Sequence, residues 1–309
     1  MQVSFFTLGC KVNQFETEAM IEILEKEGFE IIEPCKDTDV FVINTCAVTS
    51  ESDRKSRQFM KRAKRLNNNA IVAAVGCSAQ LNDKKIIEEM PVDIVIGSKN
   101  KSYIGEYIKR AIKEKKKFFE VKNFNKHENY EELKINKVYG RTRANIKIQD
   151  GCRQFCSYCI IPYVRGPIRS RKKQNIIEEV KILAKNNYKE IVLNGIHISS
   201  YGKDLKEPIE LINVIEDIEK IKGVERIRLG SLEPRIITES FVKKLSNCSK
   251  LCDHFHLSLQ SGSDTVLKRM NRKYSSKEYE EKVNIIRKWL PNSGITTDII
   301  VGFPQETDM

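Results

Sequence analysis

The chain has 309 residues, which exceeds one ordinary hydrophobic core and suits two domains of typical size. Its 40% hydrophobic content excludes a disordered chain, and the lack of an 18-residue apolar run or a charged leader predicts a cytoplasmic protein without a membrane span. The 54 Lys and Arg residues against 42 Asp and Glu leave a net charge of +12, which is compatible with a polyanionic partner but does not identify one.

The first hundred residues alternate short β-branched or aromatic runs with amphipathic stretches. Strands are expected at VSFFTL, FEII, VFVINT, AIVAAV and DIVI. Helices are expected at 16–26, 51–66, 83–90 and 101–112. This alternation is typical of a doubly wound parallel sheet, so we expect residues 1–115 to form one α/β domain.

Residues 116–140 are charged, rich in Asn and aperiodic, which predicts a linker. Five further strands are expected after them, at RANIKIQ, EIVLNG, RIRLGS, HFHLSLQ and TTDIIVGF, with helices at 176–187 and 276–290. Repeated βα units predict a second domain over 141–309, a parallel, barrel-like sheet with its chemistry at the carboxyl ends of the strands.

Three cysteines lie close together directly after the strand RANIKIQ and the turn Asp150-Gly151. Cys152, Cys156 and Cys159, the loop cysteines, have C-x3-C-x2-C spacing. Three thiolates on one loop suit three irons of a four-iron cubane and leave the fourth iron open to a ligand that is not protein. A structural zinc site would need a fourth ligand, and no nearby Cys or His supplies one.

A second cysteine group is dispersed in the sequence but shares one position relative to the strands. Cys10, Cys46 and Cys77, the strand-end cysteines, each follow a predicted strand of the first domain. The carboxyl ends of parallel strands meet at one sheet edge, where ligands bind in open α/β sheets. Each alone would suit a core position, but together they predict a second three-cysteine cluster.

Four segments together resemble the radical S-adenosylmethionine methylthiotransferases: TLGCKVNQFETE, INTCAVT, VGCSAQ and IQDGCRQFCSYCIIPYVRGPIRSR. The resemblance covers both domains and implies an N-terminal methylthiotransferase domain followed by a partial (β/α) radical-SAM barrel. Members of the family generally continue with a sixth strand and a small RNA-binding barrel. On that basis we expect a C-terminally truncated chain from which the RNA-binding barrel is absent.

The resemblance implies two [4Fe-4S] clusters and S-adenosylmethionine as cofactors. The cluster on the loop cysteines would bind S-adenosylmethionine at its open iron and cleave it to a 5′-deoxyadenosyl radical. The cluster on the strand-end cysteines would hold the sulfur that is methylated and inserted as a methylthio group. An electron donor of the flavodoxin or ferredoxin type is implied as a partner, and the sequence gives no oligomeric state.

Further residues match strand-end positions that surround S-adenosylmethionine or substrate in this superfamily. Any of them suits an ordinary turn or cap equally well. The residues expected to line the cofactor site are Tyr158, Asn194, Gly195, Glu233, Gln260 and Asp298.

The segment TLGCKVNQFETE resembles the family branch that acts on N6-threonylcarbamoyladenosine beside the tRNA anticodon. The isopentenyladenosine branch reads closer to YGCQMN, and the ribosomal-protein branch has Pro-Lys after its first cysteine. The resemblance therefore implies methylthiolation at C2 of that tRNA adenine. Isopentenyladenosine in tRNA, a ribosomal protein, and a non-catalytic RNA-binding iron-sulfur protein remain the alternatives.

Basic residues are concentrated in two places, and both are expected to contact RNA phosphates without reading sequence. The helix set lies in a predicted helix and comprises Arg54, Arg57 and Arg62. The second set follows the loop cysteines and comprises Arg165, Arg169 and Arg171. A solvated helix face is the alternative for the first set. For Arg165 and Arg169 the alternative is a role with the cofactor carboxylate or in the fold.

Overall fold

The central strands of the first sheet, at 40–45, 71–76 and 94–96, are short apolar runs that are buried almost throughout. The computed structural model describes residues 1–81, 83–125 and 128–307. The chain divides into unit 1, which comprises Met1–Tyr139 and Ile160–Pro167, and unit 2, which comprises Gly140–Cys159 and Ile168–Met309. Within the described residues, no helix is long and apolar enough to cross a lipid bilayer.

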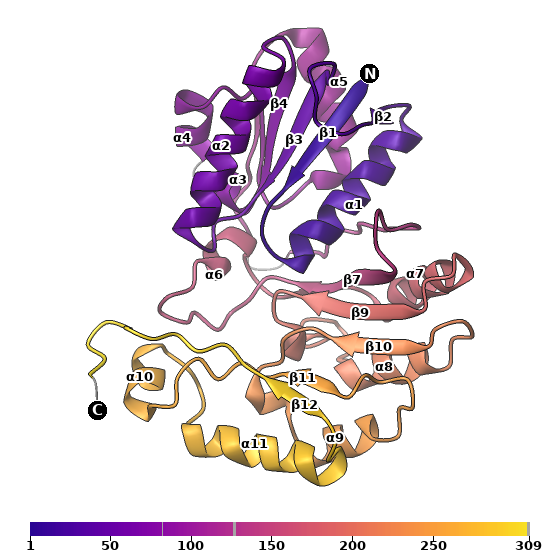
Figure 1. Cartoon of the computed structure of the whole chain (residues 1–309), viewed down its shortest axis with the longest axis vertical. Coiled ribbons are helices and arrows are strands. Elements are labelled where there is room, and N and C mark those ends of the chain that lie inside the picture. The colour runs from indigo at the N-terminus through magenta and orange to yellow at the C-terminus, as the bar shows by residue number, and fades with distance from the viewer. Residues whose placement is uncertain (82, 126–127, 308–309) are drawn as a thin grey trace. The chain divides into compact units, whose positions relative to one another are not determined.

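Unit 1 contains a parallel sheet in the order β2-β1-β3-β4-β5-β6. Its strands are β1 (Gln2–Thr7), β2 (Glu30–Ile31), β3 (Val40–Thr45), β4 (Ile71–Gly76), β5 (Ile94–Ile96) and β6 (Phe118–Glu120). The order reverses between β1 and β3, so the connections leave helices on both faces, as Figure 1 shows. The predicted doubly wound parallel sheet is therefore confirmed.

Each face of this sheet is covered by its own set of helices. One core contains α1 and α5 residues, such as Met20 and Ile108, and the other contains α2, α3 and α4 residues, such as Met60 and Ala79. The helices of unit 1 are α1 (Lys11–Lys26), α2 (Ser50–Leu66), α3 (Cys77–Leu81), α4 (Asp83–Glu89), the 3-10 turn η1 (Lys101–Tyr103), α5 (Ile104–Glu114) and α6 (Ile161–Arg165).

Residues 116–140, which the sequence predicted as a linker, largely belong to unit 1. Strand β6 extends the sheet by pairing with β5, and Leu133 and Ile135 are buried. The backbone N–H of Lys137 donates to Glu22 Oε1 in α1 at 2.9 Å. The buried apolar residues Leu133, Ile135 and Val138 are few and are separated by polar residues, so the composition of the segment resembles that of a linker.

Unit 2 has a curved sheet in the order β10-β9-β7-β8 and a two-stranded sheet of β11 and β12. Its strands are β7 (Arg143–Asp150), β8 (Arg169–Ser170), β9 (Glu190–Gly195), β10 (Arg226–Leu229), β11 (His254–His256) and β12 (Gly294–Thr296). All pairs are parallel except β7 with β8. A parallel bridge between Leu232 and Leu257 continues the curve from β10 towards β11. The result is the expected partial barrel.

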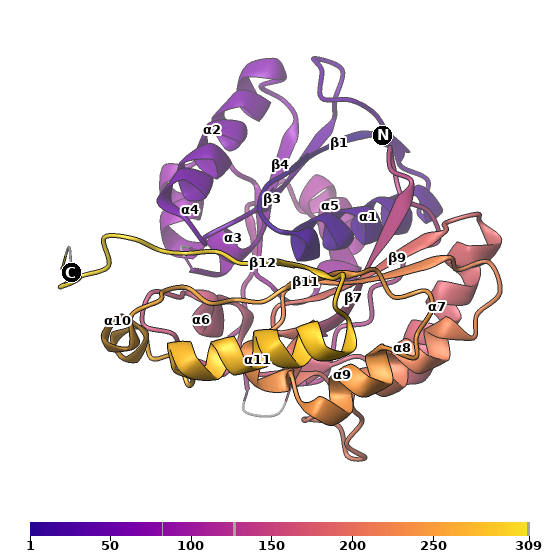
Figure 2. The ribbon, with the colours of Figure 1, turned by 60° about the horizontal axis from the view of Figure 1, so that its bottom comes forward.

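Four helices of unit 2, α7, α8, α9 and α11, lie along one side of these strands, as Figure 2 shows. The helices of unit 2 are α7 (Lys173–Lys185), η2 (Ile198–Ser200), α8 (Leu211–Glu219), η3 (Pro234–Ile236), α9 (Glu239–Leu245), α10 (Asp264–Arg269) and α11 (Ser276–Trp289).

The last strand is displaced from the run TTDIIVGF that predicted it. Strand β12 pairs His254 with Gly294 and His256 with Thr296, so it ends where that run begins. An isolated bridge between Gln260 and Ile299 continues the pairing. Asp298 therefore lies beyond the strand end.

Candidate functional site

The strand-end cysteines lie at the carboxyl edge of the unit 1 sheet. Cys10 is the N-cap of α1, Cys46 follows β3, and Cys77 is the first residue of α3. Cys10 is exposed, whereas Cys46 and Cys77 have 4% and 3% of their surface accessible. Parallel pairing of β1 with β3 and of β3 with β4 brings these three strand ends side by side.

Gly9 allows the turn before Cys10 to pass close to Cys46. Its φ is +98°, a left-handed conformation that side chains rarely adopt, and a Cβ there would lie 2.9 Å from the Sγ of Cys46. Any larger residue would displace a cysteine of the group, which explains a glycine at this position.

Buried hydrogen bonds fix the three turns relative to one another. The Asn13 side chain donates to the Leu8 carbonyl at 2.8 Å and to the Thr45 carbonyl at 2.9 Å. Thr45 Oγ1 accepts from the backbone N–H groups of Ser78 and Ala79 at 3.1 and 3.2 Å. The turns that carry Cys10, Cys46 and Cys77 are thus tied together before any ligand binds.

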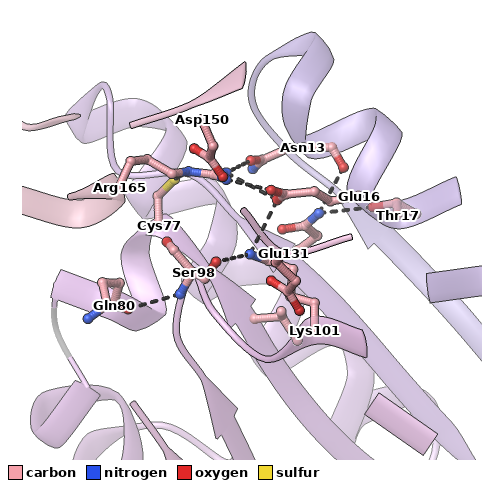
Figure 3. Close-up of polar contacts among 12 residues, drawn as sticks. Asn13, Glu16, Thr17, Cys77, Gln80, Ser98, Lys101, Glu131, Asp150 and Arg165 are labelled. Carbon is pink, nitrogen blue, oxygen red and sulfur yellow. Dashed lines mark hydrogen bonds and ion pairs between the residues drawn. The ribbon is translucent and has the colours of Figure 1, made fainter. Parts of the chain in front are cut away.

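Arg165, the last residue of α6, contacts this group directly (Figure 3). Its Nε lies 3.1 Å from Cys77 Sγ, its Nη1 donates to Glu16 Oε1 at 2.5 Å, and its Nη2 donates to Asn13 Oδ1 at 2.5 Å. Glu16 Oε2 also lies 3.4 Å from Lys101 Nζ. Arg165 has none of its surface accessible. The expectation that Arg165 contacts RNA phosphates is wrong, because a buried guanidinium cannot reach one.

Burial makes a bare thiolate costly at both groups. It raises the pKa of Cys77, and the Arg165 guanidinium opposes that rise. Burial likewise raises the pKa of Cys46, and in unit 2 it raises the pKa of Cys152 to about 11. Metal coordination deprotonates a thiol outright, so a bound cation would offset this cost.

The loop cysteines begin directly after β7, where the strand end is held by buried polar groups. The Asp150 carboxylate accepts from the Gly151 N–H at 2.8 Å and from Lys147 Nζ at 3.1 Å. Gln149 Nε2 donates at 2.7 Å to the carbonyls of Asp150 and Gly151, while its Oε1 accepts from the His197 N–H at 2.6 Å. The Asp-Gly turn is therefore tied to the end of β9.

The other side of the loop is held by residues just after α10. Arg272 Nη1 lies 3.2 Å from Cys156 Sγ, and its Nε donates to the Tyr274 hydroxyl at 2.9 Å. Asn271 Nδ2 donates at 2.8 Å to the carbonyl of Phe155, whose φ is +50°. Local sequence does not predict this support, because the segment lies more than 100 residues from the loop. The one signal for it is the basic run NRK before Tyr274.

The residues expected to line the cofactor site differ in what they contact. The Tyr158 ring makes an edge contact with Phe303. Asn194 is buried and donates to Asn145 Oδ1 at 3.1 Å, so its amide binds the neighbouring strand. A Cβ at Gly195 would lie 3.0 Å from the Gln149 carbonyl oxygen, which leaves no room for a side chain.

Of the residues expected to line the cofactor site, Glu233 is linked through Arg235 to the cysteine loop, whereas Gln260 and Asp298 hydrogen-bond to each other. Glu233 accepts from Arg235 Nε at 2.6 Å, and Arg235 Nη2 donates to Gln154 Oε1 in the cysteine loop at 3.0 Å. Gln260 has a φ of +75°, and its N–H donates to the carbonyl of Asp298 at 3.0 Å.

Arg169 and Arg171 are also buried, so their predicted contacts with RNA phosphates are wrong. Arg169 Nη2 lies 3.4 Å from Asp150 Oδ2 beneath the cysteine loop, and Arg171 pairs with Glu179 in α7. Both serve the fold of unit 2.

The helix set lies on α2 and is accessible to a partner. Arg54 and Arg62 are exposed and Arg57 is half-buried. Arg54 pairs with Glu51, and the Arg62 guanidinium lies 5.6 Å from the centre of the Phe6 ring. Side chains of this kind can exchange a surface ion pair for a phosphate at small cost.

The donor set of both cysteine groups fits an iron-sulfur cluster. Across the three described stretches of the chain, no three His, Cys, Asp or Glu side chains converge closely enough to hold a single metal ion. Thiolates of a cubane each bind a different iron, so they need not converge on one point. Three soft donors on turns that are already fixed suit such a cluster in each unit.

Comparisons with known proteins match two families to successive parts of the chain. Residues 2–97 match the family described as Uncharacterized protein family UPF0004, and residues 146–309 match the Radical SAM superfamily. Threonylcarbamoyladenosine tRNA methylthiotransferase MtaB of Bacillus subtilis is 41% identical over 307 residues, which are 99% of this chain and 68% of that protein. The tRNA-2-methylthio-N(6)-dimethylallyladenosine synthase of Clostridium tetani is 39% identical over 98% of this chain and 68% of its own length.

A solved structure shows the same fold at much lower identity. The radical S-adenosylmethionine methyltransferase TsrM from Kitasatospora setae, with tryptophan and a SAM analog bound, superposes with a TM-score of 0.66 at 15% identity. The match covers 96% of this chain and 67% of that one.

Proposed function

This chain belongs to the radical S-adenosylmethionine methylthiotransferases, and from that premise we propose that it methylthiolates N6-threonylcarbamoyladenosine in tRNA, at C2 of the adenine beside the anticodon. The main support for this substrate is the match to the Bacillus subtilis relative, which extends through both units and whose name gives that nucleoside.

In this proposal the loop cysteines hold a [4Fe-4S] cluster and S-adenosylmethionine binds beside it. When bound, the two supply radical chemistry at a C–H bond that has no acidic proton for a base to remove. Gln149 and Asp150 keep the Asp-Gly turn in place beneath the cysteines. Arg272 donates to Cys156 from the opposite side.

The strand-end cysteines hold the second [4Fe-4S] cluster in this proposal, the one associated with sulfur insertion. Two features of unit 1 support the assignment: all three thiols lie at adjacent strand ends, and Gly9 leaves space beside Cys46. The exposed Cys10 gives this group an open side through which a substrate can approach.

The RNA and the electron donor are the proposed partners. Arg54, Arg57 and Arg62 on α2 contact tRNA phosphates, which position the RNA without reading its sequence. A protein of the flavodoxin or ferredoxin type supplies electrons, and the reaction takes place in the cytoplasm, where the chain's free cysteines stay reduced.

The test uses chain reconstituted with iron and sulfide under argon. With dithionite, S-adenosylmethionine and tRNA that carries N6-threonylcarbamoyladenosine, we expect 5′-deoxyadenosine and the 2-methylthio nucleoside by mass spectrometry. The Cys152→Ala variant should form neither. Wild-type protein that loads iron and binds tRNA but cleaves no S-adenosylmethionine would instead identify a non-catalytic RNA-binding iron-sulfur protein.

A second substrate is favoured by the Clostridium tetani relative, whose name gives dimethylallyladenosine. The same assay with tRNA that carries that nucleoside separates the two. Product only from the dimethylallyl substrate would replace the proposed substrate and leave the enzyme class unchanged.

A further inference from the structure

We propose that Arg165 is a positioning residue for the second cluster, where its Nε donates a hydrogen bond to the sulfur of Cys77 and raises the cluster's reduction potential. This inference rests on the proposed function, because it requires iron on the strand-end cysteines.

The guanidinium is fixed in one orientation. The Glu16 carboxylate accepts hydrogen bonds from Arg165 Nη1 at 2.5 Å and from Nη2 at 3.2 Å, so the two side chains form a bidentate ion pair. Asn13 Oδ1 accepts a further bond from Nη2. With the two Nη groups engaged in this way, Nε faces Cys77 Sγ at 3.1 Å.

Cys77 is fixed as firmly as its donor. It begins α3, and the two residues after it donate their backbone N–H groups to Thr45 Oγ1. Helices α3 and α6, both in unit 1, pack against each other, so the N–H···S contact joins two anchored groups. Figure 3 shows the guanidinium between Cys77 and the pair Glu16 and Asn13.

Burial decides what this contact does. At most 3% of the surface of Arg165, Glu16 or Cys77 is accessible to solvent, so water does not compete for the sulfur. A charge-assisted donor withdraws electron density from a ligating thiolate and stabilises the more negative, reduced cluster. Hydrogen bonds to the sulfurs are among the factors that set iron-sulfur potentials.

A purely structural role would explain a buried Arg-Glu pair but makes a different prediction. Removing either member of such a pair destabilises a protein whether or not a cluster is present. If Arg165 also donates to Cys77, removing it will shift the reduction potential of the second cluster in protein that is fully loaded with iron. The potential therefore separates the two roles.

The test uses the full chain with Cys152, Cys156 and Cys159 all changed to Ala, so that iron binds only at the strand-end cysteines. Iron and sulfide are counted per chain, and the midpoint potential is read by EPR during a redox titration. Arg165→Met should lower the potential by the equivalent of at least a tenfold change in the one-electron equilibrium, about 59 mV. Arg165→Lys keeps the charge but has no Nε, and should shift it in the same direction by less.

Arg171→Lys is the matched control, because Arg171 is an equally buried arginine whose guanidinium pairs with Glu179 in unit 2. It should leave the potential unchanged. A loaded Arg165→Met protein with the wild-type potential would overturn the inference.

A measurement on unsubstituted Arg165 decides the case if its variants do not fold. In the same three-alanine background with [15N]arginine, pulsed EPR of the reduced cluster should show a 15N coupling from Nε. Its absence would overturn the inference. A background chain that loads no iron would instead refute the proposed second cluster itself, and the two failures are thereby distinguished.

Discussion

Arg272 lies 116 residues after Cys156 in the sequence, yet its Nη1 is 3.2 Å from the Cys156 sulfur. The side chain is held over the Tyr274 ring, with its Cζ 4.9 Å from the ring centre, and the Tyr274 hydroxyl donates to the carbonyl of Leu259 at 2.9 Å. A turn after α10 thus supports the loop that begins at the end of β7. Both cysteine groups therefore include one sulfur that accepts from a guanidinium, Cys77 in unit 1 and Cys156 in unit 2.

Changing Arg272 to Ala removes the donor to Cys156. We expect the rate of 5′-deoxyadenosine formation to fall about 10- to 100-fold, the usual cost of losing an outer partner of a metal ligand. Exposed Lys268 in α10 gives the control, since Lys268→Ala should keep the wild-type rate. An Arg272→Ala protein with full iron and an unchanged rate would show that the contact has no role in catalysis.

Changing Gln149 to Met removes three hydrogen bonds at a fully buried position while nearly keeping the volume. The carbonyls of Asp150 and Gly151 would lose their donor, at a cost of about 1–3 kcal/mol in the free energy of unfolding. Urea unfolding of cluster-free protein measures this loss. The exposed Gln174→Met change on α7 is the control, and equal midpoints for both variants would contradict the role given to Gln149.

His197 should make unit 2 less stable in mild acid. Burial lowers the pKa of His197 to about 4, and its Nε2 has no hydrogen-bond partner in the part of the chain that the structure describes. Because the folded pKa lies below the unfolded value of 6.5, the unfolded chain binds the proton first. Stability from this group is complete above pH 6.5 and is lost as the pH falls towards 4.

The expected loss between pH 7 and pH 5 is about 2 kcal/mol for a shift of this size. It is measured as the difference between wild type and His197→Asn in urea unfolding at the two pH values. The variant should lose less stability than wild type on acidification. Parallel losses in both proteins would contradict a buried neutral imidazole.

The arginines of α2 should contribute to tRNA affinity through charge alone. Changing Arg54, Arg57 and Arg62 to Gln should weaken binding and reduce the slope of log K against log salt by about 1 for each phosphate that the helix no longer neutralises. Changing Lys115, Lys116 and Lys117 to Gln is a control in unit 1 that removes the same number of charges. These lysines line a surface cavity with Ile71, the first residue of β4, and so lie near the strand starts rather than the strand ends that carry the cysteines. Equal salt slopes in both triple variants would show that α2 does not face the RNA.

The location of the cysteines was predictable because one rule places them. Cys10, Cys46 and Cys77 each follow a run that is apolar enough to identify as a buried strand, and parallel strands end at one edge. The loop cysteines needed only their spacing. Both inferences rest on local sequence and on the periodicity of single elements.

The residues that support the cysteines were not predictable in this way. The position of Arg165 after the loop in sequence predicts a phosphate contact, but the segment 160–167 belongs to unit 1, where Glu16 and Asn13 bind the side chain. Arg272 reaches Cys156 only through the tertiary fold. A basic residue looks the same in sequence whether it meets a phosphate, a carboxylate or a sulfur.

The most direct measurement is nucleoside mass spectrometry of tRNA from a strain that lacks its own threonylcarbamoyladenosine methylthiotransferase and expresses this chain. We predict that wild-type chain produces the 2-methylthio derivative of N6-threonylcarbamoyladenosine, and that Cys77→Ala and Cys156→Ala each abolish it. Stable, iron-loaded chain that leaves this nucleoside unmodified would contradict the proposed function.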